Sequence, residues 1–155
     1  AYFNTKLRDK IGMTGTWIPD GDLSVYWSTP RSMARFGLLA LAKGNWNGTQ
    51  IINSAYLNNA TTTSQSINLA YGYLWWLNGK TSYHMPQSQL QIPGTLIPTA
   101  PSDMYCALGK NDQKIYVVPS KKLVIIRMGD AADTSNFALS DFDETLWQKI
   151  SAVIN

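Results

Sequence analysis

Three short apolar runs near the C-terminal end constrain the fold of this chain more than any other feature. They cover residues 104–108, 114–118 and 123–128, so only five residues and then four residues separate them. Connections this short join antiparallel neighbours, because a parallel pair needs a crossover of about a dozen residues or more. The three runs therefore predict an antiparallel meander.

One segment ahead of the meander carries strong helix signals. Thr29 offers a capping side chain, Pro30 suits the first helical position, and Gly44 follows the last residue of the apolar pattern. The sequence therefore predicts a helix over residues 31–43. Gly37 lies inside its apolar stripe, which predicts close packing against a neighbouring element.

Two further helices are predicted. The first is shorter and starts at Asn53 or Ser54, and it runs to Thr61. The second follows Ser140 and covers residues 141–154, with acidic residues near its positive N-terminal end. Its packed face is predicted to hold Phe142, Leu146, Ile150 and Val153.

The middle of the chain predicts a hairpin and then a long loop. The aromatic-rich residues 71–77 end at Asn78-Gly79, a dipeptide typical of hairpin turns, so a second strand is expected over residues 80–84. Residues 85–102 contain four prolines, which exclude a central strand or a helix. Together the elements predict an α+β fold in which helices cover an antiparallel sheet.

Composition excludes several classes of function. The 13 basic and 10 acidic residues are scattered, so the net charge of +3 does not indicate a nucleic-acid site. A single Cys106 and a single His84 exclude the multi-cysteine and two-histidine metal motifs, and no metal or other cofactor is expected. The longest apolar run, residues 36–42, is far shorter than the ~20 residues of a membrane span.

Familiar catalytic motifs are missing from the sequence. No serine fits S-x-x-K, and neither G-x-S-x-G nor H-E-x-x-H occurs. The matches to Y-x-N that begin at Tyr2 and Tyr56 are expected by chance in a chain with 8 tyrosines. A lone histidine such as His84 is more typical of a structural residue than of a general base. Cys106 lies in an apolar run, where a free cysteine behaves as a small hydrophobic residue.

Several segments nevertheless match a known group in the same order along the chain. They are residues 10–13, residues 28–43 with Ala34-Arg35-Phe36-Gly37, residues 44–48, residues 71–76, residues 107–113, residues 115–119 and residues 123–127. In these segments the chain resembles the β-lactamase-like serine hydrolases, which include class C β-lactamases, D-alanyl-D-alanine carboxypeptidases and esterases. The resemblance implies the C-terminal part of a β-lactamase/transpeptidase-like fold.

The resemblance also implies what this chain lacks. Members of that group carry an S-x-x-K nucleophile and a later Y-x-N, both ahead of the segment that resembles residues 2–13. Residues 1–155 are therefore expected to form a single partial domain that is inactive alone and whose partner is the missing N-terminal half. The parent protein would cleave an ester, amide or peptide bond of a small-molecule or peptide substrate, in the periplasm or elsewhere outside the cytoplasm.

The resemblance assigns candidate site residues at the end of one predicted strand. The third motif of the group falls on Ala107-Leu108-Gly109, where Ala107 stands in place of a basic residue. This departure argues against efficient β-lactam hydrolysis and favours an esterase-like or peptidase-like member. The backbone N–H of Lys110 is implied as the oxyanion donor, Gly109 as the point where an acyl group approaches, and Ala107 and Leu108 as cleft lining. The proline-rich residues 86–101 are a candidate wall.

Two other interpretations remain open from the sequence. In a strand, Tyr71, Tyr73 and Trp75 would share one face and Trp76 the other, which suits a non-catalytic module that binds carbohydrate or peptidoglycan. Ordinary core packing explains the same aromatic residues. A member of the hydrolase group that has lost catalysis and serves as a scaffold would also fit the replacement at Ala107.

Overall fold

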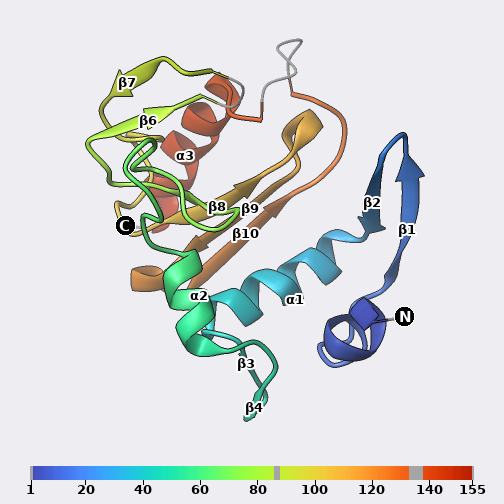
Figure 1. The fold of residues 1–155 in the computed structure, drawn as a ribbon. Helices are drawn as coiled ribbons and strands as arrows, with labels where there is room; N and C mark the ends of the chain where they lie inside the picture. The colour runs from blue at the N-terminus through green and yellow to red at the C-terminus, as the bar shows by residue number, and fades with distance from the viewer. Residues whose placement is uncertain (1, 86–87, 133–137, 155) are drawn as a thin grey trace.

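A four-stranded antiparallel sheet with the order β10-β9-β8-β5 forms the centre of the molecule (Figure 1). The structure is a computed structural model that describes residues 2–85, 88–132 and 138–154. The strands are β5 (Trp76–Leu77), β8 (Tyr105–Leu108), β9 (Lys114–Val118) and β10 (Leu123–Arg127). The predicted meander is confirmed, because β9 pairs in antiparallel register with both β8 and β10.

Two helices cover opposite faces of this sheet. Helix α1 (Pro30–Leu41) packs on the face formed by Tyr105, Ile115 and Val117, and helix α3 (Asp141–Ile154) packs on the other face. The predicted cap of α1 is present, since the Thr29 side chain accepts a hydrogen bond from the Ser32 amide. An α+β fold with helices over an antiparallel sheet is therefore what the chain forms.

Gly37 lies where α1 approaches β10 most closely. A Cβ atom added at this position would stand 2.5 Å from Cγ1 of Val124, a distance that side chains do not tolerate. The close packing predicted for Gly37 is confirmed. The glycine lets the helix backbone lie directly against the sheet.

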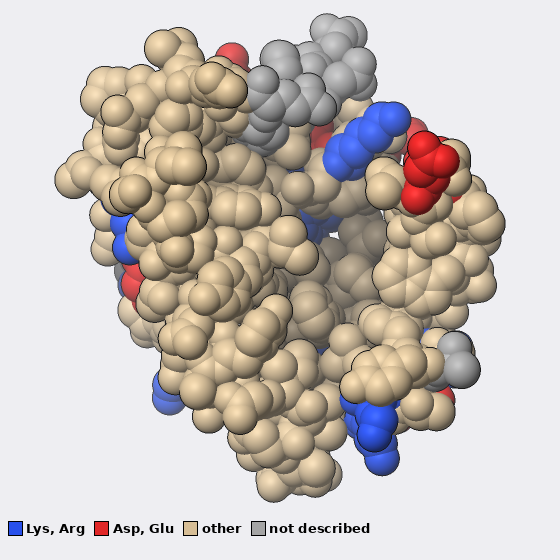
Figure 2. All heavy atoms as spheres, viewed as in Figure 1, with Lys and Arg blue, Asp and Glu red and all other residues tan. Residues whose placement is uncertain are grey.

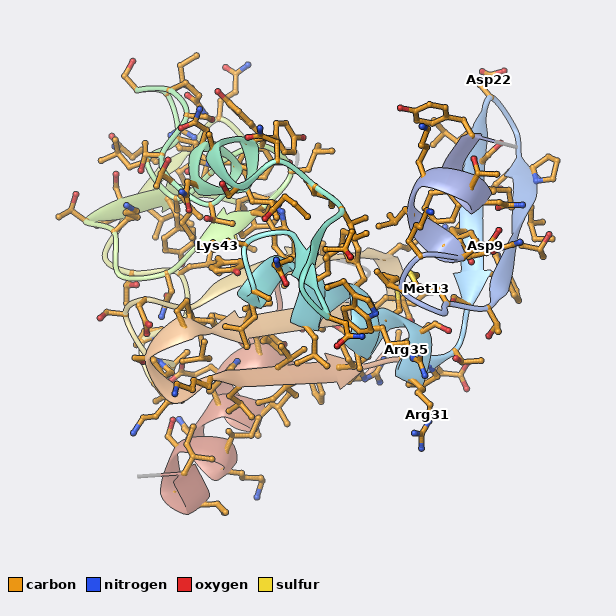
Figure 3. All side chains as sticks on the ribbon, turned by 90° about the horizontal axis from the view of Figure 1, so that it is seen from below. Asp9, Met13, Asp22, Arg31, Arg35 and Lys43 are labelled. Atoms are coloured by element: carbon orange, nitrogen blue, oxygen red, sulfur yellow. The ribbon has the colours of Figure 1, made fainter. Side chains whose placement is uncertain are left out.

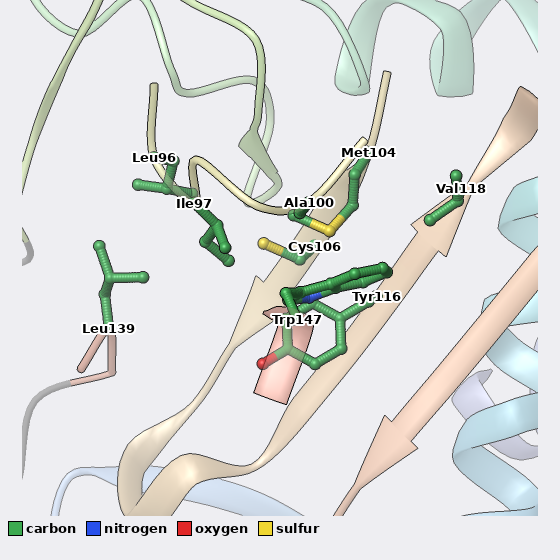
Figure 4. Packing of buried hydrophobic residues seen from close by; sticks show 9 residues of the cluster. All are labelled: Leu96, Ile97, Ala100, Met104, Cys106, Tyr116, Val118, Leu139 and Trp147. Carbon is green, nitrogen blue, oxygen red and sulfur yellow. The ribbon is translucent and has the colours of Figure 1, made fainter. Parts of the chain in front are cut away.

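Helix α3 buries part of the predicted stripe, because Leu146 and Ile150 pack against the core cluster. Trp147 is fully buried among Cys106, Tyr116 and Met104, whereas Val153 is 83% exposed (Figure 4). The prediction for Val153 is therefore wrong. The stripe that faces the sheet also contains Asp143 and Trp147. The Asp143 carboxylate accepts a hydrogen bond from the Tyr116 hydroxyl, and the Trp147 ring packs edge to face on the Tyr116 ring.

The hairpin predicted at Asn78-Gly79 does not form. β5 pairs with β8, and β6 (Ser82–His84) pairs with β7 (Gln91–Pro93) from inside the proline-rich segment. The Asn78 side chain is buried, and its amide donates to the carbonyls of Ile97, Ala100 and Pro101 at 3.0–3.1 Å. These bonds tie the residues after β5 to the long loop, so the two strands separate.

Residues 71–75 form a tight turn, and the strand β5 begins only at Trp76. The Gly72 amide donates to the Trp75 carbonyl at 2.8 Å, and Leu74 has a φ of 64°. Trp75 is buried in the core beside α1, and Tyr73 points into solvent. The strand predicted over residues 71–75 is therefore wrong, and the burial of Trp75 agrees with the alternative of core packing.

The proline-rich segment is only partly a loop. Besides β7, it contributes Leu96, Ile97 and Ala100 to the core cluster under α3. Thr99 ties it to that helix, because its amide donates to a Glu144 carboxylate oxygen at 3.3 Å. Pro86, the first residue of the candidate wall, lies outside the described residues.

Several shorter elements complete the fold. Helix α2 (Ser54–Ala60) is confirmed, with Asn53 as its cap. Strands β3 (Asn45–Trp46) and β4 (Thr49–Gln50) form a small hairpin behind α1. None of the described helices has the length and apolar content that crossing a membrane requires.

The N-terminal region was not predicted from the sequence. A π-helical turn over Asn4–Arg8 leads to a hairpin of β1 (Gly15–Asp20) and β2 (Leu23–Ser28), which lies apart from the central sheet in Figure 1. Arg35 of α1 reaches toward this region and donates to the Ile11 carbonyl at 3.0 Å (Figure 3). The hairpin itself exposes Trp17, Ile18, Leu23, Val25 and Trp27. Figure 2 shows the surface hollowed between this region and the rest of the molecule.

Candidate active site

The turn that joins β8 to β9 brings the predicted oxyanion donor to the end of a strand. The Gly109 amide donates to the Gln113 carbonyl at 2.8 Å, and Lys110–Asp112 form one 3₁₀ turn between them. Lys110 is exposed, and its amide donates to no residue in the described part of the chain. This N–H therefore has no acceptor among the described residues.

The predicted cleft residues lie side by side at the open end of β8. β5 pairs only with Tyr105 and Cys106, so among the described strands Ala107 and Leu108 have a partner on the β9 side alone. Both are half-buried: Ala107 packs toward α1 and Leu108 toward α3. Two cavities, of about 610 and 240 Å³, have other residues in their walls. That Ala107 and Leu108 line a cleft stays a prediction.

Gly109 has a structural reason to lack a side chain. A Cβ atom added there would lie 3.3 Å from both Cβ and the carbonyl oxygen of Gln113. The turn closes tightly because this space is empty. The observed role of Gly109 is to let the turn close. Its role in admitting an acyl group stays a prediction.

A buried charge network lies directly behind the turn. Nζ of Lys114 is 3.1 Å from Oδ1 of Asp112 and 3.0 Å from Oδ2 of Asp143, and it also donates to the Ala138 carbonyl. All three charged side chains are at most 3% exposed. The network therefore joins the turn, the first residue of β9 and the first helical turn of α3.

Hydrogen bonds keep the Asp112 carboxylate of this network charged. Burial alone would raise the pKa of Asp112, but the Ala132 amide and the Lys114 ammonium hold that pKa below its ordinary value. The Tyr116 hydroxyl donates to Oδ1 of Asp143 at 2.5 Å, and burial together with this negative neighbour raises the pKa of Tyr116. The phenol therefore stays protonated and acts as a fixed donor.

Side chains from the sheet also hold the carbonyls of the turn. Nη1 of Arg127 donates to the carbonyls of Asn111 and Asp112 at 3.0 and 3.3 Å, and Nε2 of Gln113 donates to the Asn111 carbonyl at 2.7 Å. Both Asn111 and Asp112 have a φ of 56°, a left-handed conformation that these bonds stabilise. The orientation of the Lys110 amide is thus fixed from several directions.

Sequence reasoning missed these supporting residues. The only signal in the sequence was a pair of opposite charges beside an apolar run. Lys114 is the first residue of that strand, and Asp112 precedes it by two residues. A charged residue at the start of a strand is normally read as solvated. Only the pairing of β9 with strands on both sides shows that the ammonium lies in the interior.

The other two singled-out residues have separate locations. Cys106 is fully buried under α3, and burial raises the pKa of its thiol far above the ordinary value, so the thiol is unreactive in the folded chain. His84 lies in β6 at the wall of the larger cavity, remote in sequence from the turn. Over residues 2–85, 88–132 and 138–154, no group of three or more His, Cys, Asp or Glu is arranged to hold a metal ion.

Comparison with known proteins gives matches in structure only. No family model matches the chain, and no curated protein sequence matches it. A solved structure described as a putative 6-aminohexanoate-dimer hydrolase from Bacillus anthracis superimposes with a TM-score of 0.66 at 22% identity, over 96% of this chain and 37% of that one. A second, described as a putative beta-lactamase from Bacteroides dorei DSM 17855, superimposes with a TM-score of 0.61 at 13% identity, over 97% of this chain and 50% of that one.

These matches concern the fold and its extent. The chain spans 37% of the length of the first of these two proteins and 50% of the second. At sequence identities of 22% and 13%, the matches show a similar fold and say nothing about the reaction. The chain therefore has a β-lactamase-like fold.

Proposed function

We propose that this chain is the C-terminal part of a serine hydrolase that cleaves an ester, amide or peptide bond through an acyl-enzyme. The observation that supports the proposal most is that the amide of Lys110, an exposed residue, has no acceptor among the described residues. It lies at the end of β8, in the fold that the two matched proteins share. In this proposal the nucleophile belongs to a part of the protein outside these 155 residues.

The reaction would divide between the two parts of the protein. A serine hydroxyl outside this chain attacks the substrate carbonyl, and a base beside it takes the hydroxyl proton. The C–O bond forms, and negative charge develops on the former carbonyl oxygen. The Lys110 N–H would donate to this oxygen, and a fixed donor is effective there because it needs no reorganisation as the charge appears. Collapse expels the leaving alcohol or amine with the proton, and water later hydrolyses the acyl-enzyme.

The residues behind the turn would act as positioning residues. Lys114 and Asp112 hold the turn from inside, and Arg127 holds its carbonyls from the sheet. None of the three is proposed to touch substrate. Their contribution would be to keep the amide aimed at one point, which is what an oxyanion donor requires.

Removal of a single N–H tests this proposal. In the complete natural protein, Lys110→Pro deletes the backbone donor, and the site accepts proline because it opens a helical turn after an extended Gly109 with φ −112° and ψ 165°. Hydrolysis of a p-nitrophenyl ester should fall in kcat by about 10²–10³-fold. KM should change little.

The matched control is Lys110→Ala, which keeps the amide and removes only the exposed side chain. It should retain the activity of the natural protein. Equal activity in Lys110→Pro and Lys110→Ala would refute the oxyanion role. Ester hydrolysis by residues 1–155 alone would refute the proposed division between the two parts.

The same proposal includes a location outside the cytoplasm. It also includes a substrate of the esterase-like or peptidase-like class. Ala107 in place of a basic residue supports poor turnover of β-lactams. The assay therefore includes a chromogenic cephalosporin beside the ester and a D-alanyl-D-alanine peptide. We expect the rate of hydrolysis to be higher for the ester or the peptide than for the cephalosporin.

A further inference from the structure

The larger of the two cavities described above is a second candidate site, apart from the turn after β8. It has a volume of about 610 Å³, within the range usual for small-molecule sites. Its walls come from the segment ahead of the aromatic turn, from β5 and β6, and from the start of the proline-rich segment. The lining residues are Ile67, Asn68, Tyr71, Trp76, His84, Met85, Ser88 and Gln89.

One wall of the cavity is aromatic and rigid. Tyr71 and Trp76 meet edge to face with ring centroids 4.8 Å apart, and an isolated β-bridge joins their backbones. Trp76 also packs against the core cluster under α3. Two rings fixed in this way present apolar surface that loses little conformational entropy when a ligand packs on it.

The polar groups of the cavity have unused hydrogen-bonding capacity. Within the described residues, the side chains of Tyr71, Trp76, His84 and Gln89 form no hydrogen bond. Asn68 accepts from the Ala70 amide at 3.1 Å through Oδ1, which leaves its NH₂ group as a donor. Indole and amide N–H groups are donors, while the amide oxygen and one imidazole nitrogen are acceptors.

The described walls of the cavity carry no charged side chain. Among the lining residues that the structure describes, none is Lys, Arg, Asp or Glu. A phosphate or carboxylate ligand would have no counter-ion there, and a cationic ligand would have no carboxylate. The chemistry that fits is uncharged, carries both donors and acceptors around its edge, and has an apolar face for the rings. The C–H face and hydroxyl rim of a sugar ring have this combination.

We propose that the cavity beside Tyr71 and Trp76 binds the ring of an uncharged saccharide. In the bound state a C–H face packs on Trp76, and the hydroxyl groups exchange hydrogen bonds with Asn68, His84 and Gln89. The site differs from the aromatic strand expected from the sequence, because Trp75 is buried and Tyr73 lies outside the lining. It is also independent of hydrolysis, since it shares no residue with the turn after β8.

The experiment titrates the 155-residue chain with neutral oligosaccharides, using cellotriose and chitotriose as probes. Binding is followed by calorimetry and by tryptophan fluorescence, and glucose 6-phosphate serves as a charged competitor. Saturable binding of at least one neutral probe is expected, with glucose 6-phosphate at least tenfold weaker. His84→Ala and Gln89→Ala should each weaken binding at least fivefold without a change in the melting temperature. Trp76→Ala should weaken it more than tenfold.

Trp17→Ala is the matched control, because Trp17 is a half-exposed tryptophan of β1 outside the cavity. It should bind the probes as the unchanged chain does. The proposal is overturned if neither probe binds at 10 mM, if His84→Ala and Gln89→Ala bind as the unchanged chain does, or if glucose 6-phosphate binds more tightly than both probes. Lys110→Pro should leave saccharide binding unaltered, so failure here and failure of the hydrolase proposal give separate results.

Discussion

At the scale of single residues, the molecule holds a buried charge network that the sequence pattern did not predict. The Lys114 ammonium lies between two carboxylates, and the Tyr116 hydroxyl and the backbone groups of Ala132, Ala138 and Ser140 complete the bonds. Such a network stabilises one geometry only while every member is present, because an unpaired charge in the interior is expensive.

Loss of the cation should therefore be severe. Lys114→Met leaves Asp112 and Asp143 buried without a counter-ion, and we expect the free energy of unfolding to fall by about 3–5 kcal/mol. Urea denaturation measures this change. Lys149→Met, at an exposed position of α3, is the control and should change stability by less than about 0.5 kcal/mol. Equal effects of the two substitutions would show that the network contributes nothing.

Asp112 also predicts how stability depends on pH. Its pKa is lower in the folded chain than in the unfolded one, so its contribution is fully present above the unfolded value of about 4 and is lost as pH falls through the folded value. We expect the free energy of unfolding to decrease steadily below about pH 4. Asp112→Asn should flatten this slope, whereas Asp22→Asn at the exposed hairpin tip should not.

At the scale of elements, the sequence predicts a helix or strand well where neighbouring residues determine it. It predicts poorly where a residue distant in sequence supplies the partner. Thr29 and Pro30 define the start of α1 through bonds within one turn, so the prediction for that helix is confirmed. Asn78-Gly79 has the local signature of a hairpin, but residues 95–101 satisfy the Asn78 side chain. Nothing near Asn78 in the sequence shows that partner.

The same contrast applies to the candidate site. The strand end at Ala107 and the turn at Lys110 follow from the apolar pattern and the glycine after it. The groups that fix the turn could not be predicted, because Asp143 is 31 residues beyond Asp112 and meets it only when α3 folds back on the sheet. The resemblance named these residues as a candidate site, and tertiary packing supplies the groups that hold the turn.

Asn78→Ala should show how much this one side chain contributes. It removes five hydrogen bonds and leaves buried backbone groups of the long loop without partners. We expect a loss of about 2–4 kcal/mol in the free energy of unfolding. Asn59→Ala, at an exposed position of α2, should be close to neutral. A loss below 1 kcal/mol for Asn78→Ala, seen in urea denaturation, would mean that water replaces the amide without cost.

At the scale of the whole molecule, apolar side chains are distributed unevenly. The sheet and its two helices bury most of the core, while the hairpin of β1 and β2 exposes most of its large side chains to solvent. The two regions are joined mainly at Ile11, Met13 and Leu39, which form a small cluster of their own. Stability is therefore concentrated on the sheet side.

A pair of tryptophan substitutions measures this difference. Trp147→Ala empties a fully buried site between α3 and the sheet and should lower the free energy of unfolding by about 3–5 kcal/mol. Trp27→Ala removes a side chain that is 66% exposed and should cost less than about 0.5 kcal/mol. Thermal unfolding followed by calorimetry compares the two. Similar losses would contradict the proposed concentration of stability.

The two-residue strand β5 has a consequence for the order of folding. β8, β9 and β10 are neighbours in sequence, so their turns close small loops, whereas Trp76 must find Cys106 across 30 residues of chain. Closing the larger loop costs more entropy, so the meander is expected to form first and β5 to dock late. The aromatic cavity beside β5 would then be the last part of the sheet side to assemble and the first to open.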